Sequence, residues 1–113
     1  MTRQRAQAVV PTISVWGVRG IAVDSSGIVF ISDQTNHVIW FFNSTNGNLR
    51  VFAGLPGTPG LKDGLGSAAR FRAPGSLSMS DDEQLINCVD TGNSVIRQIG
   101  RDGTVVTLGG TAP

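Results

Sequence analysis

Ile31-Ser-Asp-Gln-Thr-Asn-His-Val-Ile39 returns further along the chain as Cys88-Val-Asp-Thr-Gly-Asn-Ser-Val-Ile96. The two stretches share the skeleton Asp-x-x-Asn-x-Val-Ile and lie 57 residues apart. Two shorter echoes flank them, Ala53-Gly54 with Gly109-Gly110 and Arg19-Gly20 with Pro74-Gly75. A period of this length indicates a repeat architecture, in which each unit buries its apolar face by stacking on a neighbour.

The composition favours an all-β fold. The chain has 113 residues, of which 40% are hydrophobic, and its 15 Gly and five Pro supply many turns. No stretch of helix formers reaches ten residues without a breaker, so we expect short strands joined by tight turns. The net charge of +1 gives no overall attraction to nucleic acid or to a membrane surface.

Each repeat divides into four predicted strands. Runs rich in β-branched and aromatic residues, separated by turn residues, place strands at 20–24, 28–32, 38–42 and 48–52, and again at about 76–80, 84–89, 94–99 and 104–108. The predicted turn residues after each second strand are Asp33, Asn36, Asp90 and Asn93. An Asp carboxylate at this place accepts backbone N–H groups two or three residues on, and Asn tolerates a left-handed conformation. Four short antiparallel strands in one repeat are typical of a propeller blade.

These residues resemble the NHL repeat of β-propeller proteins. The resemblance rests on Gly20-Ile-Ala-Val-Asp24, on the two copies of the Asp-x-x-Asn-x-Val-Ile skeleton and on a joining stretch from Asp63 to Pro74. It implies two four-stranded antiparallel blades, one third of a six-bladed propeller. The predicted organisation is an N-terminal arm or extra edge strand at 1–18, a first blade at 19–54, an inter-blade linker at 55–74, a second blade at 75–110 and a tail at 111–113.

Two blades alone would leave two apolar sheet faces in water. A head-to-tail contact between identical chains closes into a ring when the rotation allows it, so we expect the chain to associate with itself as a homotrimer. The alternative is that the sequence is a piece of a longer propeller. Residues 8–16 are expected either to form a ninth strand or to remain a loose tail.

The start of the chain has basic residues but no apolar core of a signal peptide, and no segment reaches transmembrane length. The sequence therefore predicts a cytoplasmic protein without a membrane partner. The single cysteine, Cys88, lies in an apolar strand pattern and is expected to be buried.

The candidate ligand-binding residues are basic and lie in the linker and around the turns on the same face of the blades: Arg19, His37, Lys62, Arg70 and Arg72. Arg side chains form forked hydrogen bonds with carboxylates and phosphates, so this face is predicted to bind an anion. The competing interpretation is structural, with Arg70 pairing with Asp63 or another carboxylate to stiffen the linker and Phe71 filling the gap between blades.

Catalytic and metal sites have no support in the sequence. One histidine and one cysteine cannot build a zinc site, and the glycine-rich run from Gly54 to Gly60 lacks the Gly-Lys-Ser/Thr ending of a phosphate loop. Some propellers similar to this family are lyases with histidine-rich centres, which this chain lacks. We therefore expect a non-catalytic binding platform for a peptide or small anion, without a cofactor. The alternative is single-stranded RNA binding on the Arg-bearing face, with Arg70-Phe71-Arg72 as the only local candidate.

Overall fold

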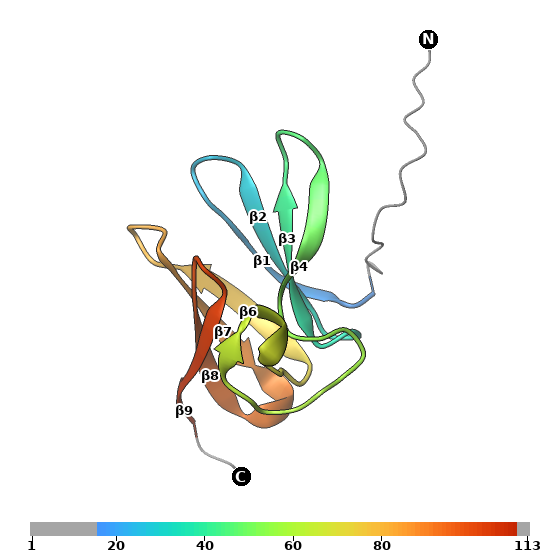
Figure 1. Ribbon diagram of the computed structural model, residues 1–113. Coiled ribbons are helices and arrows are strands. Elements are labelled where there is room, and N and C mark those ends of the chain that lie inside the picture. The colour runs from blue at the N-terminus through green and yellow to red at the C-terminus, as the bar shows by residue number, and fades with distance from the viewer. Residues whose placement is uncertain (1–15, 111–113) are drawn as a thin grey trace.

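A computed structural model describes residues 16–110 of the chain and shows two antiparallel sheets (Figure 1). The first sheet, blade 1, has the order β1 (Val18–Val23), β2 (Ile28–Asp33), β3 (Val38–Asn43) and β4 (Asn48–Ala53). Each strand pairs with the next one along the chain, as expected of an up-and-down blade. The all-β fold class is therefore confirmed.

The second sheet, blade 2, repeats this order and adds a strand. It contains β6 (Pro74–Met79), β7 (Leu85–Asp90), β8 (Val95–Gly100) and β9 (Thr104–Gly109), and β5 (Gly64–Leu65) of the linker pairs with the outer edge of β9. The prediction of four strands was incomplete for blade 2, because the two residues of β5 are too few to show a strand pattern in the sequence. The added strand covers part of an edge that would otherwise expose backbone groups.

Short 3₁₀ turns are the only helical segments among residues 16–110: η1 (Gly66–Ala68) and η2 (Thr91–Asn93). No helix in this range has the length and apolar character needed to cross a membrane. Residues 8–15 of the predicted ninth strand lie outside the described residues, and Trp16 lies in a turn. The residues that adopt a left-handed backbone at the two repeated turns are His37 (φ 62°) and Ser94 (φ 57°). Each lies one residue after the asparagine that was expected to adopt it, Asn36 or Asn93.

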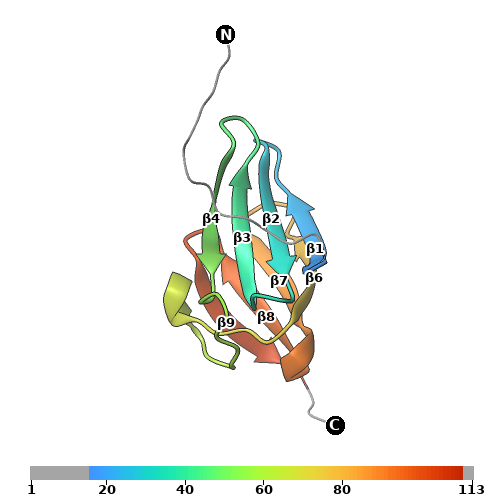
Figure 2. The same cartoon turned by 90° about the vertical axis from the view of Figure 1, so that its right-hand side faces the viewer.

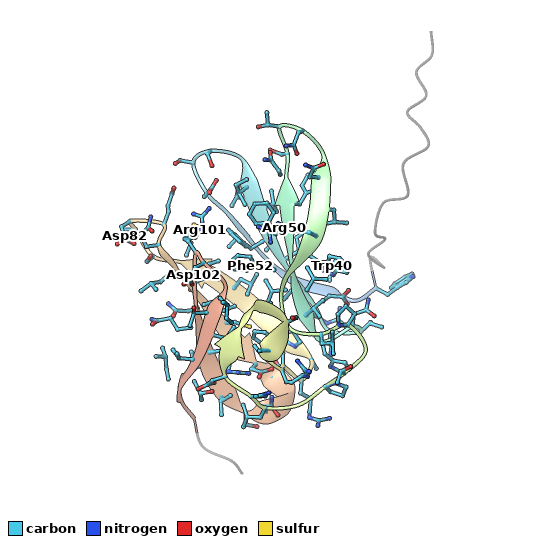
Figure 3. All side chains as sticks on the ribbon, viewed as in Figure 1. Trp40, Arg50, Phe52, Asp82, Arg101 and Asp102 are labelled. Atoms are coloured by element: carbon cyan, nitrogen blue, oxygen red, sulfur yellow. The ribbon has the colours of Figure 1, made fainter. Side chains whose placement is uncertain are left out.

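The two blades bury a continuous core between them. Strand pairing sets Phe30 opposite Phe41 on one face of blade 1, and Phe52 joins them, with ring centroids of Phe30 and Phe52 4.9 Å apart. Blade 2 presents Ile86, Cys88, Ile99 and Val105 to the same core. Figure 3 shows Phe52 between the sheets and Trp40 on the side of blade 1 away from blade 2. Trp40 and Phe42 lie on one face of β3, and Phe41 lies on the other.

Side chains of the hairpin tips also tie the two blades together. The Ser25 amide and hydroxyl both donate to the Glu83 carboxylate, at 3.0 and 2.9 Å. Arg101 donates to Asp24 at 2.9 Å, and its guanidinium carbon lies 5.1 Å from the centre of the Phe30 ring. The labelled side chains of Asp82, Arg101 and Asp102 gather at these tips in Figure 3, and Figure 2 shows the two sheets lying against each other in a second view.

Asp24 makes the stability of this arrangement depend on pH. Burial opposes ionisation of Asp24, but hydrogen bonds from the Ile28 amide, from Ser26 and from Arg101 outweigh it and lower the pKa from 3.8 to about 2. A carboxyl whose pKa is depressed by folding stabilises the native state above its unfolded pKa, and this contribution is lost as the pH falls through the folded pKa.

We therefore predict that the free energy of unfolding falls between about pH 4 and pH 2, with Asp24 accounting for about 2 kcal/mol of the loss. The Asp24→Asn variant should be less stable at pH 6 and should lose less than the wild type over this window. Urea unfolding at several pH values measures both. If the free energy of unfolding fell with pH by the same amount in both proteins, the assignment of this pH dependence to Asp24 would be contradicted.

Candidate functional site

Arg97 of β8 holds the inter-blade linker in place through hydrogen bonds to its backbone. Its side chain is fully buried, and Nη1 donates to Asp90 Oδ2 at 2.8 Å and to the Arg70 carbonyl at 2.7 Å. Nη2 donates to the Lys62 carbonyl at 2.7 Å and to Asp63 Oδ1 at 3.2 Å. One guanidinium therefore holds two points of the linker and two carboxylates, and it is the pairing with Asp90 that makes its burial tolerable.

Blade 1 carries a tryptophan at the position of Arg97. The indole Nε1 of Trp40 donates to Asp33 Oδ2 at 3.0 Å, just as Arg97 donates to Asp90. Asp33 also accepts from the amides of Thr35 and Asn36, both at 3.0 Å. Burial opposes ionisation of Asp33, but hydrogen bonds from the Trp40 indole and from Asn36 outweigh it and lower the pKa.

The two repeated aspartates, Asp33 and Asp90, differ in their hydrogen-bond partners. Asp33 caps its own turn, whereas Asp90 Oδ1 accepts from the Arg72 amide at 2.9 Å and Oδ2 from Asn93 Nδ2 at 2.8 Å. Asn93 reaches further and donates to the Gly60 carbonyl at 2.8 Å. The second copy of the motif is thus turned toward the linker.

Two basic candidates are engaged in holding the linker. His37 Nδ1 accepts from the Ala73 amide at 3.0 Å, so this nitrogen carries no proton and positions the end of the linker. The Arg70 guanidinium donates to the carbonyls of Ser67 and Ala69. The expected pairing of Arg70 with Asp63 was wrong, because Asp63 bonds Arg97 instead.

Of the five basic candidates, Arg19 lines a cavity at the start of the inner strands β1 and β6. This cavity has a volume of about 240 Å³, and it is lined by Arg19, Gln34, Ala73, Gly75, Ser76, Val89 and Thr91. Arg19 is exposed, and its Nη1 donates to the carbonyls of Trp16 and Val18 at 3.0 and 3.2 Å. Lys62 and Arg72 are exposed elsewhere on the linker.

The candidate residues predicted from the sequence did not include the other polar residues that line this cavity. Gln34 and Thr91 occupy the same place in the two repeats, directly after the aspartates Asp33 and Asp90, and Ser76 begins the exposed side of β6. Their shared register after the second strand was visible in the sequence and could have identified them.

A second cavity, of about 330 Å³, opens on blade 2. It is lined by Val89, Thr91, Ser94, Val95, Ile96 and Gly110. Its walls are mostly apolar, with the Thr91 and Ser94 hydroxyl groups at one side. It lies where β7 ends and β8 begins, on the side of blade 2 away from blade 1.

Residues 16–110 place neither a metal cluster nor a reactive cysteine beside these cavities. No group of three or more His, Cys, Asp or Glu side chains in this range could hold a metal ion. Cys88 is buried, and burial together with the nearby Asp90 raises the pKa of its thiol to about 12. A thiol that stays protonated is a poor nucleophile.

The fold matches solved structures of β-propeller-like proteins. An auxiliary nutrient binding protein from Bacteroides thetaiotaomicron superposes with a TM-score of 0.67 at 24% identity, over 82% of this chain and 26% of that chain. A similar protein from Bacteroides ovatus gives 0.64 at 23% identity, over 77% and 24%. The virginiamycin B lyase of Staphylococcus aureus gives 0.63 at 20% identity, over 86% and 28%.

The present chain therefore spans about a quarter of the length of these structures. At such identities the match shows the fold alone. No protein-family model matches the sequence, and none of the curated proteins matches it.

The structure predicts that Arg97→Met is strongly destabilising. Methionine keeps the apolar stem but leaves the Asp90 carboxylate buried without its cation, which costs about 3–5 kcal/mol. Asp63→Asn is the matched control, because Asp63 is half exposed and its pairing with Arg97 is worth less than about 1 kcal/mol. Urea unfolding compares the two variants, and a loss below about 1 kcal/mol for Arg97→Met would contradict the anchoring role.

Proposed function

We propose that this chain is a non-catalytic, NHL-type module that builds a β-propeller binding platform by joining its two outer sheet faces to other copies of itself. The observation that carries the proposal is the repeat itself. The two faces left exposed are the counterparts of the two faces that pack together inside the chain.

The exposed face of blade 2, here called the trailing face, consists of Val89, Ile96, Val106 and Leu108, each at least 37% exposed. Strand pairing makes these residues the counterparts of the blade 1 face that packs on blade 2. Ile96 corresponds to Ile39, which is completely buried. Leu108, 56% exposed, is the extra residue of the same bulge that Phe52 occupies in blade 1.

The exposed face of blade 1, here called the leading face, consists of Ile21, Val23, Val29, Ile31 and Phe42. By the same register they correspond to Leu77, Met79, Ile86, Cys88 and Ile99, which form the blade 2 side of the core. A leading face is thus built to receive a trailing face.

A contact between the leading face of one copy and the trailing face of the next is heterologous, because it joins two different surfaces. A heterologous contact repeated with a constant rotation closes into a ring or grows into a filament. Propellers have roughly four to eight blades, and the NHL resemblance implies six, so three copies would close the ring. Closure removes both exposed apolar faces from water, which is the driving force for assembly.

The side-chain chemistry of the described residues agrees with a binding role. Within the described residues the thiol of Cys88 is buried and protonated, and His37 spends Nδ1 on the Ala73 amide. Two matched solved structures are auxiliary nutrient binding proteins, which agrees with a binding platform, whereas a third is a lyase. RNA binding finds no support in the proposed Arg70-Phe71-Arg72 segment, because Phe71 is fully buried and cannot stack on a base.

We predict that the wild-type chain has a molar mass of about three chains in solution, measured by light scattering coupled to size-exclusion chromatography. Leu108→Glu places a charge on the trailing face and should shift the protein toward the monomer. Leu61→Glu is the matched control, since Leu61 is 54% exposed and lies in the linker, and it should leave the mass unchanged. A monomeric wild type at high concentration would refute self-assembly.

A second candidate function is binding of a small anion in the cavity beside Arg19. An Arg side chain, the amide of Gln34 and the hydroxyls of Ser76 and Thr91 line a recess beside the inner strands, where a propeller has its central opening. Assembly would repeat this recess around that opening and raise the local concentration of anions.

Arg19→Gln should therefore weaken binding of inorganic phosphate about tenfold, since a charge-assisted hydrogen bond contributes about 1.5–3 kcal/mol. Arg70→Gln removes an equal charge outside this cavity and is the control. Isothermal titration at low and at physiological salt measures both. Equal losses in the two variants would show that phosphate responds to overall charge and not to the cavity.

A further inference from the structure

Phe71 is the side chain that locks blade 2 onto blade 1. It is completely buried, and the guanidinium carbon of Arg97 lies 4.9 Å from the centre of its ring. On the blade 1 side it packs on Gly54, where an added Cβ would come within 3.2 Å of the ring. The same added Cβ would lie 2.9 Å from the His37 carbonyl and 3.2 Å from the Val38 Cα. His37, Val38 and Gly54 thus mark the seat of Phe71 on blade 1.

Blade 2 carries a second copy of this seat. Gly110 lies against the Ser94 carbonyl and Val95, as Gly54 lies against the His37 carbonyl and Val38. His37 and Ser94 share the left-handed backbone that shapes this turn. In blade 2 the seat is the open cavity of about 330 Å³ lined by Val89, Thr91, Ser94, Val95, Ile96 and Gly110. Nothing among residues 16–110 fills it.

Trp16, the first described residue, occupies the position in blade 1 that Phe71 occupies in blade 2. Gly17 lies beside the carboxylate of Asp33, since an added Cβ there would be 2.5 Å from Oδ1. Arg72 lies beside Asp90, whose Oδ1 accepts from its amide, and beside Gly92, the counterpart of the Thr35 that lies next to Gly17. The residue before Gly17 therefore corresponds to the residue before Arg72, which is Phe71. That residue is Trp16, an aromatic side chain that is 84% exposed.

The spacing of the sequence agrees with this correspondence. Trp16 and Phe71 are 55 residues apart, within one residue of the 56 that separate the strand counterparts Ile21 and Leu77. Trp16 lies two residues before the start of β1 at Val18, and Phe71 lies three residues before the start of β6 at Pro74. Blade 1 thus carries an exposed aromatic side chain, Trp16, and blade 2 carries an open cavity of the kind that Phe71 fills on blade 1.

We infer that Trp16 of one copy inserts into the cavity of blade 2 on a second copy, in the way that Phe71 seats on blade 1 within the chain. The inference rests on the proposed self-assembly and names the contact that carries it. The cavity walls are apolar enough for an indole ring, and the hydroxyls of Thr91 and Ser94 offer oxygens to its N–H group. Buried tryptophans are frequent energetic centres of protein interfaces.

Sedimentation velocity over a range of concentrations measures the dissociation constant of the assembly. Trp16→Ala should raise it about tenfold or more, as expected for loss of a central aromatic anchor. Trp16→Phe should bind within about threefold of the wild type, because phenylalanine fills the same seat inside the chain. Ile96→Glu places a charge in the cavity and should weaken assembly as Trp16→Ala does, whereas the exposed Leu61→Ala should not.

Tryptophan fluorescence provides an independent readout. The chain has two tryptophans, and Trp40 is already 95% buried in the single chain, so the main blue shift of the emission on assembly reports on Trp16. The wild type should show this shift with the same midpoint concentration as the change in mass. The Trp16→Ala protein should show none.

The outcomes separate this inference from the proposed function. A wild type that stays monomeric overturns both. A wild type that assembles, with Trp16→Ala assembling equally well or without any blue shift, overturns the Trp16 contact and leaves self-assembly standing. Weakening by Ile96→Glu but not by Trp16→Ala would show that another segment occupies the cavity, and this also overturns it.

Discussion

The buried contact between Arg97 and the linker is the constraint on which the rest of the structure depends. One guanidinium binds Asp90, the carbonyls of Lys62 and Arg70, and the ring face of Phe71, so the linker can follow only one path between the blades. That path presses Phe71 onto Gly54 and sets the angle of blade 2 on blade 1.

The contact inside the chain and the proposed contact between chains are related but unequal. Phe30 and Phe41 face each other on the inner side of blade 1, and their counterparts on blade 2 are Asn87 and Gln98. These amides bond each other at 3.5 Å and cover less apolar area than the two rings. Since hydrophobic stabilisation scales with apolar area removed from water, the interface between copies should be weaker than the one within the chain. This difference would let the module fold first and assemble afterwards.

The repeat, the alternation of apolar residues and the turn signals sufficed to predict the class of fold and the place of eight strands, because these features act locally. Two kinds of feature were beyond the sequence. The short strand β5 forms only because β9 offers it an edge, and Gly64-Leu65 has no pattern of its own. The partner of Asp63 was misassigned, because Arg70 is near in sequence whereas Arg97 is near in space. Arg19 was predicted as a basic candidate and lines a cavity, but the polar residues that line this cavity with it come from both repeats and meet only after the blades pack.

A crystal structure of the chain grown at high concentration tests the central claim most directly. The account predicts that each leading face is covered by the trailing face of the next copy, with the same angle that relates blade 1 to blade 2 and with Leu108 buried where Phe52 lies in the internal contact. A two-fold symmetric dimer, or a structure whose outer sheet faces are covered only by solvent, would contradict it.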